Sequence, residues 1–242
     1  MGRPSAILTY HSLDDSGSVI SVRPSLFRDQ MAFLADSGIP VVPLNEALEV
    51  AGSIAITFDD GFRNLLDSAV PILERHKFPA TIFLVGGYCG GRNNWPTQPA
   101  GSVPELPLVN WAEVAGLPGR ISLGVHTMTH PHLAALAPED CEREMLECRD
   151  RIEQHLSHRA RWFAYPYGTS TPAVREIAAR HFDLAVGTSL GLLPAHPEKM
   201  HLPRIDTYYL TGRFSLHDLF GAAGRAYIGF RHFLREVRRR IH

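Results

Sequence analysis

The chain of 242 residues lacks several features that mark well-known classes of protein. It has three cysteines, Cys89, Cys141 and Cys148, which match no paired zinc spacing and leave at least one thiol unpaired. This argues against the disulfide framework of small secreted domains, and Cys141 and Cys148, seven residues apart, are predicted to share one helix face. No stretch approaches the ~18 consecutive apolar residues of a membrane-spanning helix.

The chain also lacks a large excess of charge of either sign. Its formal net charge is −1 and its isoelectric point is near 6.9, so no overall field favours nucleic acid, and we expect no nucleic-acid partner. The charge is uneven along the chain, however. Residues 213–242 carry seven arginines against Asp218 and Glu236, a local excess of +5 that leaves −6 on the rest.

The first residues lack the pattern of a secretory leader. Residues 1–10 contain one arginine and an apolar run too short for the hydrophobic segment of a leader, which predicts a cytoplasmic protein. With 45% hydrophobic residues, the chain can bury the core of a single domain. We assign residues 1–212 to that domain and residues 213–242 to a C-terminal tail.

What the chain does contain is a short apolar run that ends in two adjacent carboxylates. Residues 54–58 have the pattern of a buried strand, and Asp59, Asp60 and Gly61 follow at its C-terminal end. Neighbouring carboxylates repel each other and lose solvation, so a chain rarely places them there without a cation or a chemical task. A turn is the alternative, because Asp and Gly are common turn residues.

Two histidines four residues apart follow a second apolar run, residues 121–125. His126 and His130 could meet one metal ion, and one aspartate would complete a set of two imidazoles and a carboxylate. On its own, a histidine pair at this spacing is more often solvated surface. In combination with the two aspartates at another strand end, it favours a metal site.

Segments typical of strands and helices alternate along the chain, and the apolar run at 80–85 suits a strand covered on both faces. This alternation predicts a wound or barrel-like parallel β/α fold, whose chemistry gathers at the C-terminal strand ends. Strands are predicted at 6–10, 41–42, 54–58, 80–85, 121–125, 161–168, 184–187 and 202–205, and helices at 24–37, 65–76, 111–117 and 138–156.

Two further residues are candidates for the site. His11 directly follows the first predicted strand, where it could line a pocket or simply cap the strand end. Trp95 lies in the segment 86–108, which is rich in glycine, proline and asparagine, and loops of that length commonly cover a site. The indole ring of Trp95 could stack on a sugar ring. A structural role, in which a buried tryptophan anchors the loop, accounts for a tryptophan at this position equally well.

The tail has apolar residues at helical spacing from Leu216 onward, interleaved with arginines. This predicts a basic amphipathic helix. The simpler interpretation packs the helix on the body with its arginines in solvent. A peripheral contact with a membrane surface is the alternative.

Three motifs in order resemble those of the polysaccharide deacetylase family, also called the NodB-homology family or carbohydrate esterase family 4. They are Thr-Phe-Asp-Asp-Gly at 57–61, His-Thr-Met-Thr-His at 126–130 and Phe-Ala-Tyr-Pro-Tyr-Gly at 163–168, within a likeness that covers about residues 5–207. The resemblance implies an α/β fold: a single-domain, distorted (β/α) barrel of seven or eight mostly parallel strands. It also implies a divalent metal, most often zinc, at the C-terminal rim.

The same resemblance assigns roles to the residues of the first two motifs. It makes Asp59 the general base, and Asp60, His126 and His130 the metal ligands. This division agrees with the chemistry of amide hydrolysis, in which a metal acidifies water and a carboxylate that is not tied to the metal takes the proton.

The third motif departs from the family pattern. It implies that Tyr165, Pro166 and Tyr167 form one wall of the substrate groove, with the backbone N–H of Tyr167 helping to hold the oxyanion. The arginine that usually precedes the proline by two residues, and orients the base, is replaced by Ala164. Arg161 is the candidate to orient the base instead.

The catalytic acid of the family, a histidine near the last strands, has no clear counterpart. His201 and His196 are the histidines in that region, and His201 is the candidate. Without an effective acid, protonation of the leaving amine would be slower by ~10²-fold.

These features predict a metal-dependent hydrolase that removes N-acetyl groups from N-acetylglucosamine-like sugars of a bacterial polysaccharide or its precursor. A lipid-linked precursor would bring the basic tail near a membrane. The alternatives are hydrolysis of an O-acetyl ester or a formamide at the same site, and a catalytically silent carbohydrate-binding domain. The intact Asp59 argues against the silent domain, which has no need of a carboxylate outside the ligand set.

Overall fold

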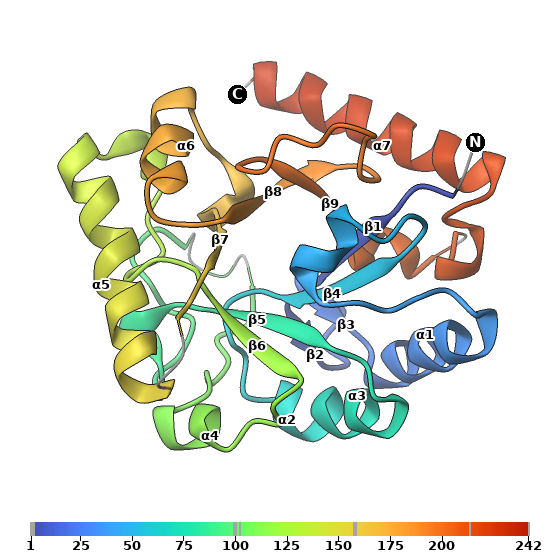
Figure 1. Ribbon diagram of the computed structural model, residues 1–242, viewed down its shortest axis with the longest axis horizontal. Coiled ribbons are helices and arrows are strands. Elements are labelled where there is room, and N and C mark those ends of the chain that lie inside the picture. The colour runs from blue at the N-terminus through green and yellow to red at the C-terminus, as the bar shows by residue number, and fades with distance from the viewer. Residues whose placement is uncertain (1–2, 99–100, 102, 157–158, 213, 242) are drawn as a thin grey trace.

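The centre of the molecule is a closed barrel of seven parallel strands, which confirms the predicted fold class (Figure 1). The structure is a computed structural model, and it describes residues 3–98, 101, 103–156, 159–212 and 214–241. Around the barrel the strands follow the order β1 (Ala6–Tyr10), β4 (Ile54–Phe58), β5 (Ala80–Leu84), β6 (Ile121–Val125), β7 (Trp162–Ala164), β8 (Leu184–Leu190) and β9 (Leu202–Asp206). A separate two-stranded sheet pairs β2 (Ser12–Leu13) with β3 (Ser21–Val22).

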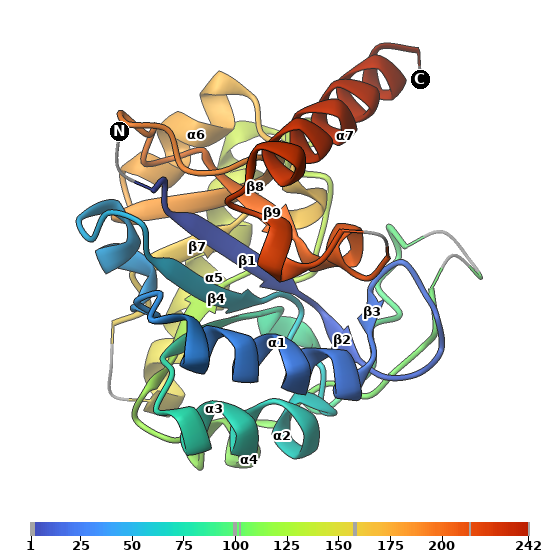
Figure 2. The same ribbon diagram turned by 90° about the vertical axis from the view of Figure 1, so that its right-hand side faces the viewer.

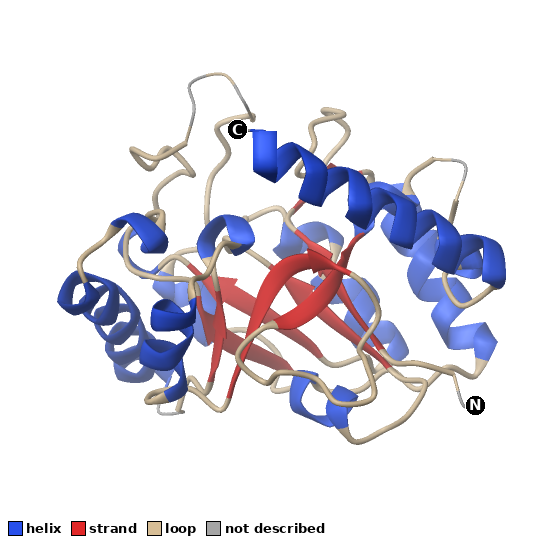
Figure 3. Ribbon diagram, turned by 90° about the horizontal axis from the view of Figure 1, so that it is seen from above, coloured by secondary structure: helices blue, strands red, loops and turns tan. Residues whose placement is uncertain are grey.

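Helices surround the barrel on its outer side, as the view from above shows (Figure 3). They are α1 (Pro24–Ser37), α2 (Leu65–Ser68), α3 (Val70–His76), α4 (Trp111–Ala115), α5 (Pro138–Leu156), α6 (Pro172–Ala179) and α7 (Ala222–Ile241). Short 3₁₀ turns join them, namely η1 (Leu44–Leu48), η2 (Gly86–Tyr88), η3 (Leu133–Ala135), η4 (Pro166–Gly168), η5 (Thr207–Leu210) and η6 (Leu216–Asp218).

Local sequence explains where several helices begin and end. Asn110 and Glu113 form a capping box at the start of α4, and the Thr171 side chain accepts from the Val174 N–H at the start of α6. Gly38 ends α1 with φ 67°, a left-handed conformation that glycine adopts without strain. These caps satisfy backbone groups that each helix end would otherwise leave unpaired.

Some predicted boundaries are wrong, each for a local reason. The helix predicted over 65–76 is broken between α2 and α3 at Ala69, because Pro71 removes a backbone donor and disfavours a continuous helix before it. The strand predicted at 41–42 is reduced to a single bridge between Val41 and Ile54, and Pro43 follows at once. The strand predicted over 161–168 ends at Ala164, where the chain turns into η4.

Apolar residues fall into two clusters, one inside the barrel and one outside it. Ile7 and Ala55 belong to one cluster, whereas their neighbours Leu8 and Ile56 belong to the other. Successive side chains of a strand point to opposite sides. The cluster that contains Ile7 and Ala55 therefore fills the barrel, and the cluster that contains Leu8 and Ile56 lies between the strands and the helices.

Helix α5 lies against the outside of the barrel. Its buried residues include Cys141, Met145, Cys148 and Ile152, which recur at helical spacing. The prediction that the two cysteines share one face is therefore confirmed. The structure also places α5 close to η2 and β6.

The C-terminal tail is a helix in its described part, as predicted, although α7 begins only at Ala222 after the separate turn η6. Residues 213 and 242 of the predicted tail lie outside the described part of the chain. Within the described residues, no helix is long and apolar enough to cross a membrane.

Candidate metal site and catalytic pocket

One aspartate and two histidines converge at the C-terminal end of the barrel strands. Asp60 Oδ1 lies 3.4 Å from His126 Nε2 and 3.5 Å from His130 Nε2. The three candidate ligand atoms all lie within 4.8 Å of one another, and the three residues are buried. Among the described groups, Asp60 Oδ1 has no hydrogen-bond partner, although it is buried. An orphaned carboxylate oxygen between two imidazole nitrogens fits a divalent metal ion.

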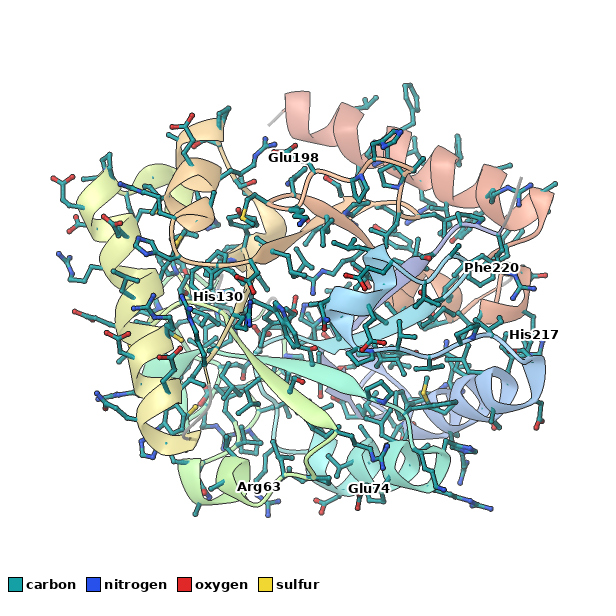
Figure 4. All side chains as sticks on the ribbon, viewed as in Figure 1. Arg63, Glu74, His130, Glu198, His217 and Phe220 are labelled. Carbon is teal, nitrogen blue, oxygen red and sulfur yellow. The ribbon has the colours of Figure 1, made fainter. Side chains whose placement is uncertain are left out.

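The backbone is strained at this site. Asp60, Thr127, His130 and Tyr167 have φ between 57° and 69°, and they account for four of the five non-glycine residues with positive φ in the described part of the chain. Such conformations cost energy and persist where the surrounding structure holds them, which is most often at functional sites. Figure 4 shows His130 between the strands and α5, in the interior of the molecule.

Backbone and side-chain contacts fix the first histidine ligand. His126 Nδ1 lies 2.8 Å from the carbonyl oxygen of Ala164 on β7. The nitrogen must donate to that carbonyl, which leaves the lone pair of Nε2 directed at the metal position. The backbone N–H of His130 donates to Thr127 Oγ1 at 3.0 Å, so the second ligand is held by the same loop.

Helix α5 supplies a residue that the sequence interpretation missed. The Glu144 carboxylate accepts hydrogen bonds from the Met128 N–H at 2.9 Å, the Thr129 N–H at 2.8 Å and Thr129 Oγ1 at 2.7 Å. One side chain therefore clamps the loop between the two histidine ligands. The charge-rich pattern of α5 contains no signal that singles out Glu144, because only the fold brings it to the loop.

Charged neighbours and burial set the protonation of the site. Burial alone would raise the pKa of Asp59, but the Arg204 guanidinium outweighs it and holds the pKa well below its usual range. The pKa of Asp60 is also lowered, because His126 and His130 outweigh its burial. Burial lowers the pKa of His130 to about 3, so this imidazole is neutral at pH 7, as a metal ligand must be.

Asp59 stands next to the ligand set but is bound to an arginine instead. Arg204 Nη1 donates to Asp59 Oδ1 at 2.8 Å and Arg204 Nη2 donates to Oδ2 at 2.6 Å, while Arg204 Nε donates to the Gly187 carbonyl at 2.8 Å. Both side chains of the pair are almost fully buried, at 2% and 3% exposure. This two-point contact fixes the orientation of the carboxylate.

The prediction that Arg161 orients the base is wrong. Arg161 directly precedes β7, at the end of the strand remote from the metal site, and it forms an exposed ion pair with Asp183. Arg204 takes the role from the middle of β9. The available signal was an arginine inside the short apolar strand 202–205, because a cation buried there requires an acidic partner.

His11 lies in the pocket, as predicted. Its Nε2 is 3.8 Å from Asp59 Oδ2, and its side chain is 24% exposed, so it can reach both the base and a substrate. The cavity above the metal ligands has a volume of about 230 Å³, and its lining includes His11, Ile20, Trp95, Tyr165 and Tyr167.

Two aromatic side chains pack around the second metal ligand. The ring centroids of Trp95 and His130 are 4.3 Å apart, and those of Tyr167 and His130 are 4.6 Å apart. The Tyr167 hydroxyl donates to Thr97 Oγ1 at 2.9 Å. Trp95 is only 3% exposed, so it anchors its loop and also lines the cavity. The anchoring interpretation is therefore confirmed, and contact of Trp95 with a sugar stays a prediction.

Part of the third motif lines the same cavity, namely Tyr165, Tyr167 and Gly168, whereas its role as a wall of a substrate groove stays a prediction. Tyr165 lines the cavity, but its hydroxyl donates to the carbonyl of Met200, away from the metal ligands. Pro166 is buried in η4. Gly168 follows with φ 66°, and a Cβ there would lie 2.0 Å from Thr188 Oγ1, so a side chain at this position would force the wall to move.

The prediction that His201 acts as the catalytic acid is wrong in its placement. His201 Nε2 lies 2.9 Å from Ser189 Oγ and its Nδ1 lies 3.4 Å from Ser170 Oγ. These residues line a separate cavity of about 310 Å³. His201 lies away from Asp60 and the two histidines because it precedes its strand, β9, whereas they follow the C-terminal ends of β4 and β6.

The fold and the site together define a class: a parallel β/α barrel with an Asp-His-His group that could hold a metal ion at its C-terminal rim and an aspartate-arginine pair beside it. The chain belongs to the polysaccharide deacetylase family, whose model matches residues 49–182, more than half of the chain. The resemblance inferred from the three motifs is thereby confirmed.

Individual relatives agree with this assignment. The chain is 31% identical over 145 residues to a chitooligosaccharide deacetylase of Sinorhizobium fredii, which covers 55% of this chain and 58% of that protein. The matches to the first curated relatives span little more than half of those relatives' own lengths, or less.

Solved structures support the fold. The deacetylase PplD of Streptococcus pyogenes superposes with a TM-score of 0.74 at 22% identity, over 90% of this chain and 96% of that one. IcaB of Ammonifex degensii gives 0.72 at 22% identity, over 94% and 98%. At this level of identity the comparison establishes the architecture alone.

Proposed function

We propose that the protein is a metal-dependent carbohydrate deacetylase that removes the N-acetyl group of an N-acetylglucosamine-like sugar. The observation that carries this proposal is the division between the two adjacent aspartates. Asp60 points into the metal site, whereas Asp59 is held outside it by Arg204. A carboxylate that is ionised at pH 7 and not bound to the metal can act as a general base.

The residues that hold the metal are Asp60, His126 and His130, and zinc suits two imidazoles and a carboxylate. When bound, the metal would acidify a water molecule and polarise the carbonyl of the acyl group. Asp59 takes the proton of the attacking water, because Arg204 keeps its carboxylate ionised and correctly turned. The Tyr167 backbone N–H stabilises the negative charge that develops on the acyl oxygen.

His11 is the residue placed to donate a proton to the leaving amine. It is partly exposed in the pocket and lies beside Asp59, which can pass the proton taken from water to Nε2. The C–N bond then breaks as the amine nitrogen receives that proton. This assignment replaces His201, whose ring faces the other cavity.

The acyl group and the sugar are proposed from the family and from the chemistry of the pocket. Relatives carry names such as chitooligosaccharide deacetylase and poly-β-1,6-N-acetyl-D-glucosamine N-deacetylase, which supports an N-acetylated amino sugar. Tyr167 offers aromatic surface to a sugar ring at the cavity, and the buried Trp95 contributes to the cavity lining.

The test is acetate release from N-acetylglucosamine oligomers by protein loaded with zinc, measured beside the Asp59→Asn variant. We expect release that requires both zinc and Asp59. O-acetylated oligosaccharides and N-formylated sugars, assayed in parallel, would reveal a different acyl group. Zinc-loaded protein that binds the oligomers but hydrolyses none of these substrates would instead identify a carbohydrate-binding domain.

A further inference from the structure

Helix α7 presents an apolar stripe to solvent. Ala226, Phe230, Phe233 and Val237 are spaced by four, three and four residues, which puts them on one face of the helix. All four are exposed, with 59% of Phe230 and 61% of Phe233 accessible to solvent. Two phenylalanines so exposed on one helix face indicate a surface that something else covers.

The opposite side of α7 packs on the body. Ile228 is 4% exposed, and the guanidinium groups of Arg231 and Arg235 lie over the Tyr209 ring, at 4.5 Å and 5.7 Å from its centroid. The simpler prediction, a solvated arginine face with the apolar face packed inward, is therefore wrong for these two arginines. The face left in water is the apolar one.

Helix α7 lies on the outside of the molecule. It starts near the N-terminus of the chain, where the Arg3 guanidinium lies 5.3 Å from the Phe220 ring, and Figure 4 shows Phe220 at that end. Its C-terminal half projects beyond the barrel in the side view (Figure 2). Over its 20 residues the helix is about 30 Å long, which is enough to lie along a flat surface.

The charge of the tail indicates which kind of surface would bind the exposed face of α7. The segment 213–242 carries an excess of +5, whereas the rest of the chain carries −6. Residues 238–240, directly after Val237 in the sequence, are three consecutive arginines. Two copies of this chain that met through α7 would bring these like charges together, at an electrostatic cost. An anionic bilayer attracts the positively charged tail, which would hold the helix flat on the lipid.

We propose that α7 is a peripheral docking helix for an anionic lipid bilayer, with Phe230, Phe233 and Val237 inserted among the acyl chains. The helix borders the catalytic side of the molecule. His232 of α7 lines the cavity that also contains His201, and Gly168 lines both this cavity and the one above the metal ligands. Docking through α7 would therefore carry the active site close to the membrane surface.

The test is flotation of the full chain with vesicles of phosphatidylcholine alone and of phosphatidylcholine mixed with phosphatidylglycerol. We expect binding to the mixed vesicles that is at least ~10-fold stronger than to phosphatidylcholine and that weakens as salt is added. The Phe230→Ser/Phe233→Ser variant should lose at least ~10-fold of this binding, because its two changes remove the inserted rings. Both residues are exposed, so the fold and the hydrolysis of a soluble oligosaccharide should be unchanged.

Val19→Ser is the matched control, because Val19 is 57% exposed but lies in the β2–β3 loop. It should bind mixed vesicles as the unaltered chain does. Equal vesicle binding by the double phenylalanine variant would overturn the proposal, as would no binding to either vesicle. Light scattering without lipid completes the test: a dimer that the double variant dissociates would assign the stripe to a second copy of the chain.

Discussion

Replacing Arg204 by methionine should lower the free energy of unfolding by about 3–5 kcal/mol, because it leaves the charge of Asp59 buried without a partner. The two side chains are 2% and 3% exposed and share two hydrogen bonds of 2.8 and 2.6 Å. Methionine fills much of the space of the arginine stem, so the loss would come mainly from the charge. A typical domain is stable by 5–15 kcal/mol, so this variant would lose a large share of its stability.

The measurement is urea unfolding of metal-free protein at pH 7, because a bound metal would add its own stabilisation. Arg204→Met is compared with Asp59→Asn and with the double variant. The double variant removes both charges, so it should be more stable than Arg204→Met alone.

The effect of Arg204 on stability should also depend on pH. Because Arg204 holds the pKa of Asp59 below its usual range, the pair stabilises the folded state at pH values above about 4, the pKa of Asp59 in the unfolded chain. This contribution is lost as the pH falls through the pKa of Asp59 in the folded protein. The cost of Arg204→Met should therefore shrink in acid.

Arg161→Met provides the control, since it breaks an ion pair of the same two residue types at the surface. The side chains of Arg161 and Asp183 are 58% and 48% exposed, and such pairs contribute less than about 1 kcal/mol. If Arg204→Met costs no more than Arg161→Met, or if Asp59→Asn fails to rescue it, the account of the buried pair is refuted.

Three further variants test the rest of the site. Glu144→Ala should weaken zinc affinity by about 10-fold or more, measured by competition with a chelating dye, whereas Glu147→Ala on the same helix should not. His11→Gln should lower kcat on N-acetylglucosamine oligomers by about 10²-fold with unchanged zinc affinity, and an unchanged kcat would remove His11 as the acid. Tyr167→Phe keeps the backbone N–H and loses the hydroxyl that donates to Thr97, so kcat should fall by less than about 10-fold; a larger loss would give the hydroxyl a direct role.

The sequence was sufficient to predict the barrel and the grouping of Asp60, His126 and His130, because both leave local signals. Each of the strands β1, β4, β5 and β6 is a short apolar run, and Asp60, His126 and His130 follow two of those runs directly. In a parallel barrel the C-terminal strand ends meet at one rim, so the pattern alone brings these three residues together. The positive φ values of Asp60 and His130 could not be foreseen, because neither residue type requires them.

Arg204 and Glu144 were missed because their roles depend on contacts across the fold. Asp59 and Arg204 are 145 residues apart, and each looks ordinary in its own segment. Arg161 lies closer in sequence to the third motif than Arg204 does, but strand direction places it at the end of β7 remote from Asp59. A motif determines only which residues are neighbours along the chain. The partner of a buried charge depends on which strands are neighbours in the closed barrel. Here β1 pairs with both β9, which carries Arg204, and β4, which precedes Asp59.

For the tail, the sequence predicts the helix but not how the helix is oriented on the body. The periodicity of 216–241 predicts two faces for the helix but does not determine which one the body covers. An arginine carries an apolar stem and a planar cation, and both can pack on an aromatic ring, as Arg231 and Arg235 do on Tyr209. The basic side of α7 can therefore serve as its packed side, and the phenylalanines are left for a partner outside the chain. Hydrophobicity alone would have placed Phe230 and Phe233 against the barrel, so their exposure is the feature that most needs a physical cause, and an anionic membrane supplies one.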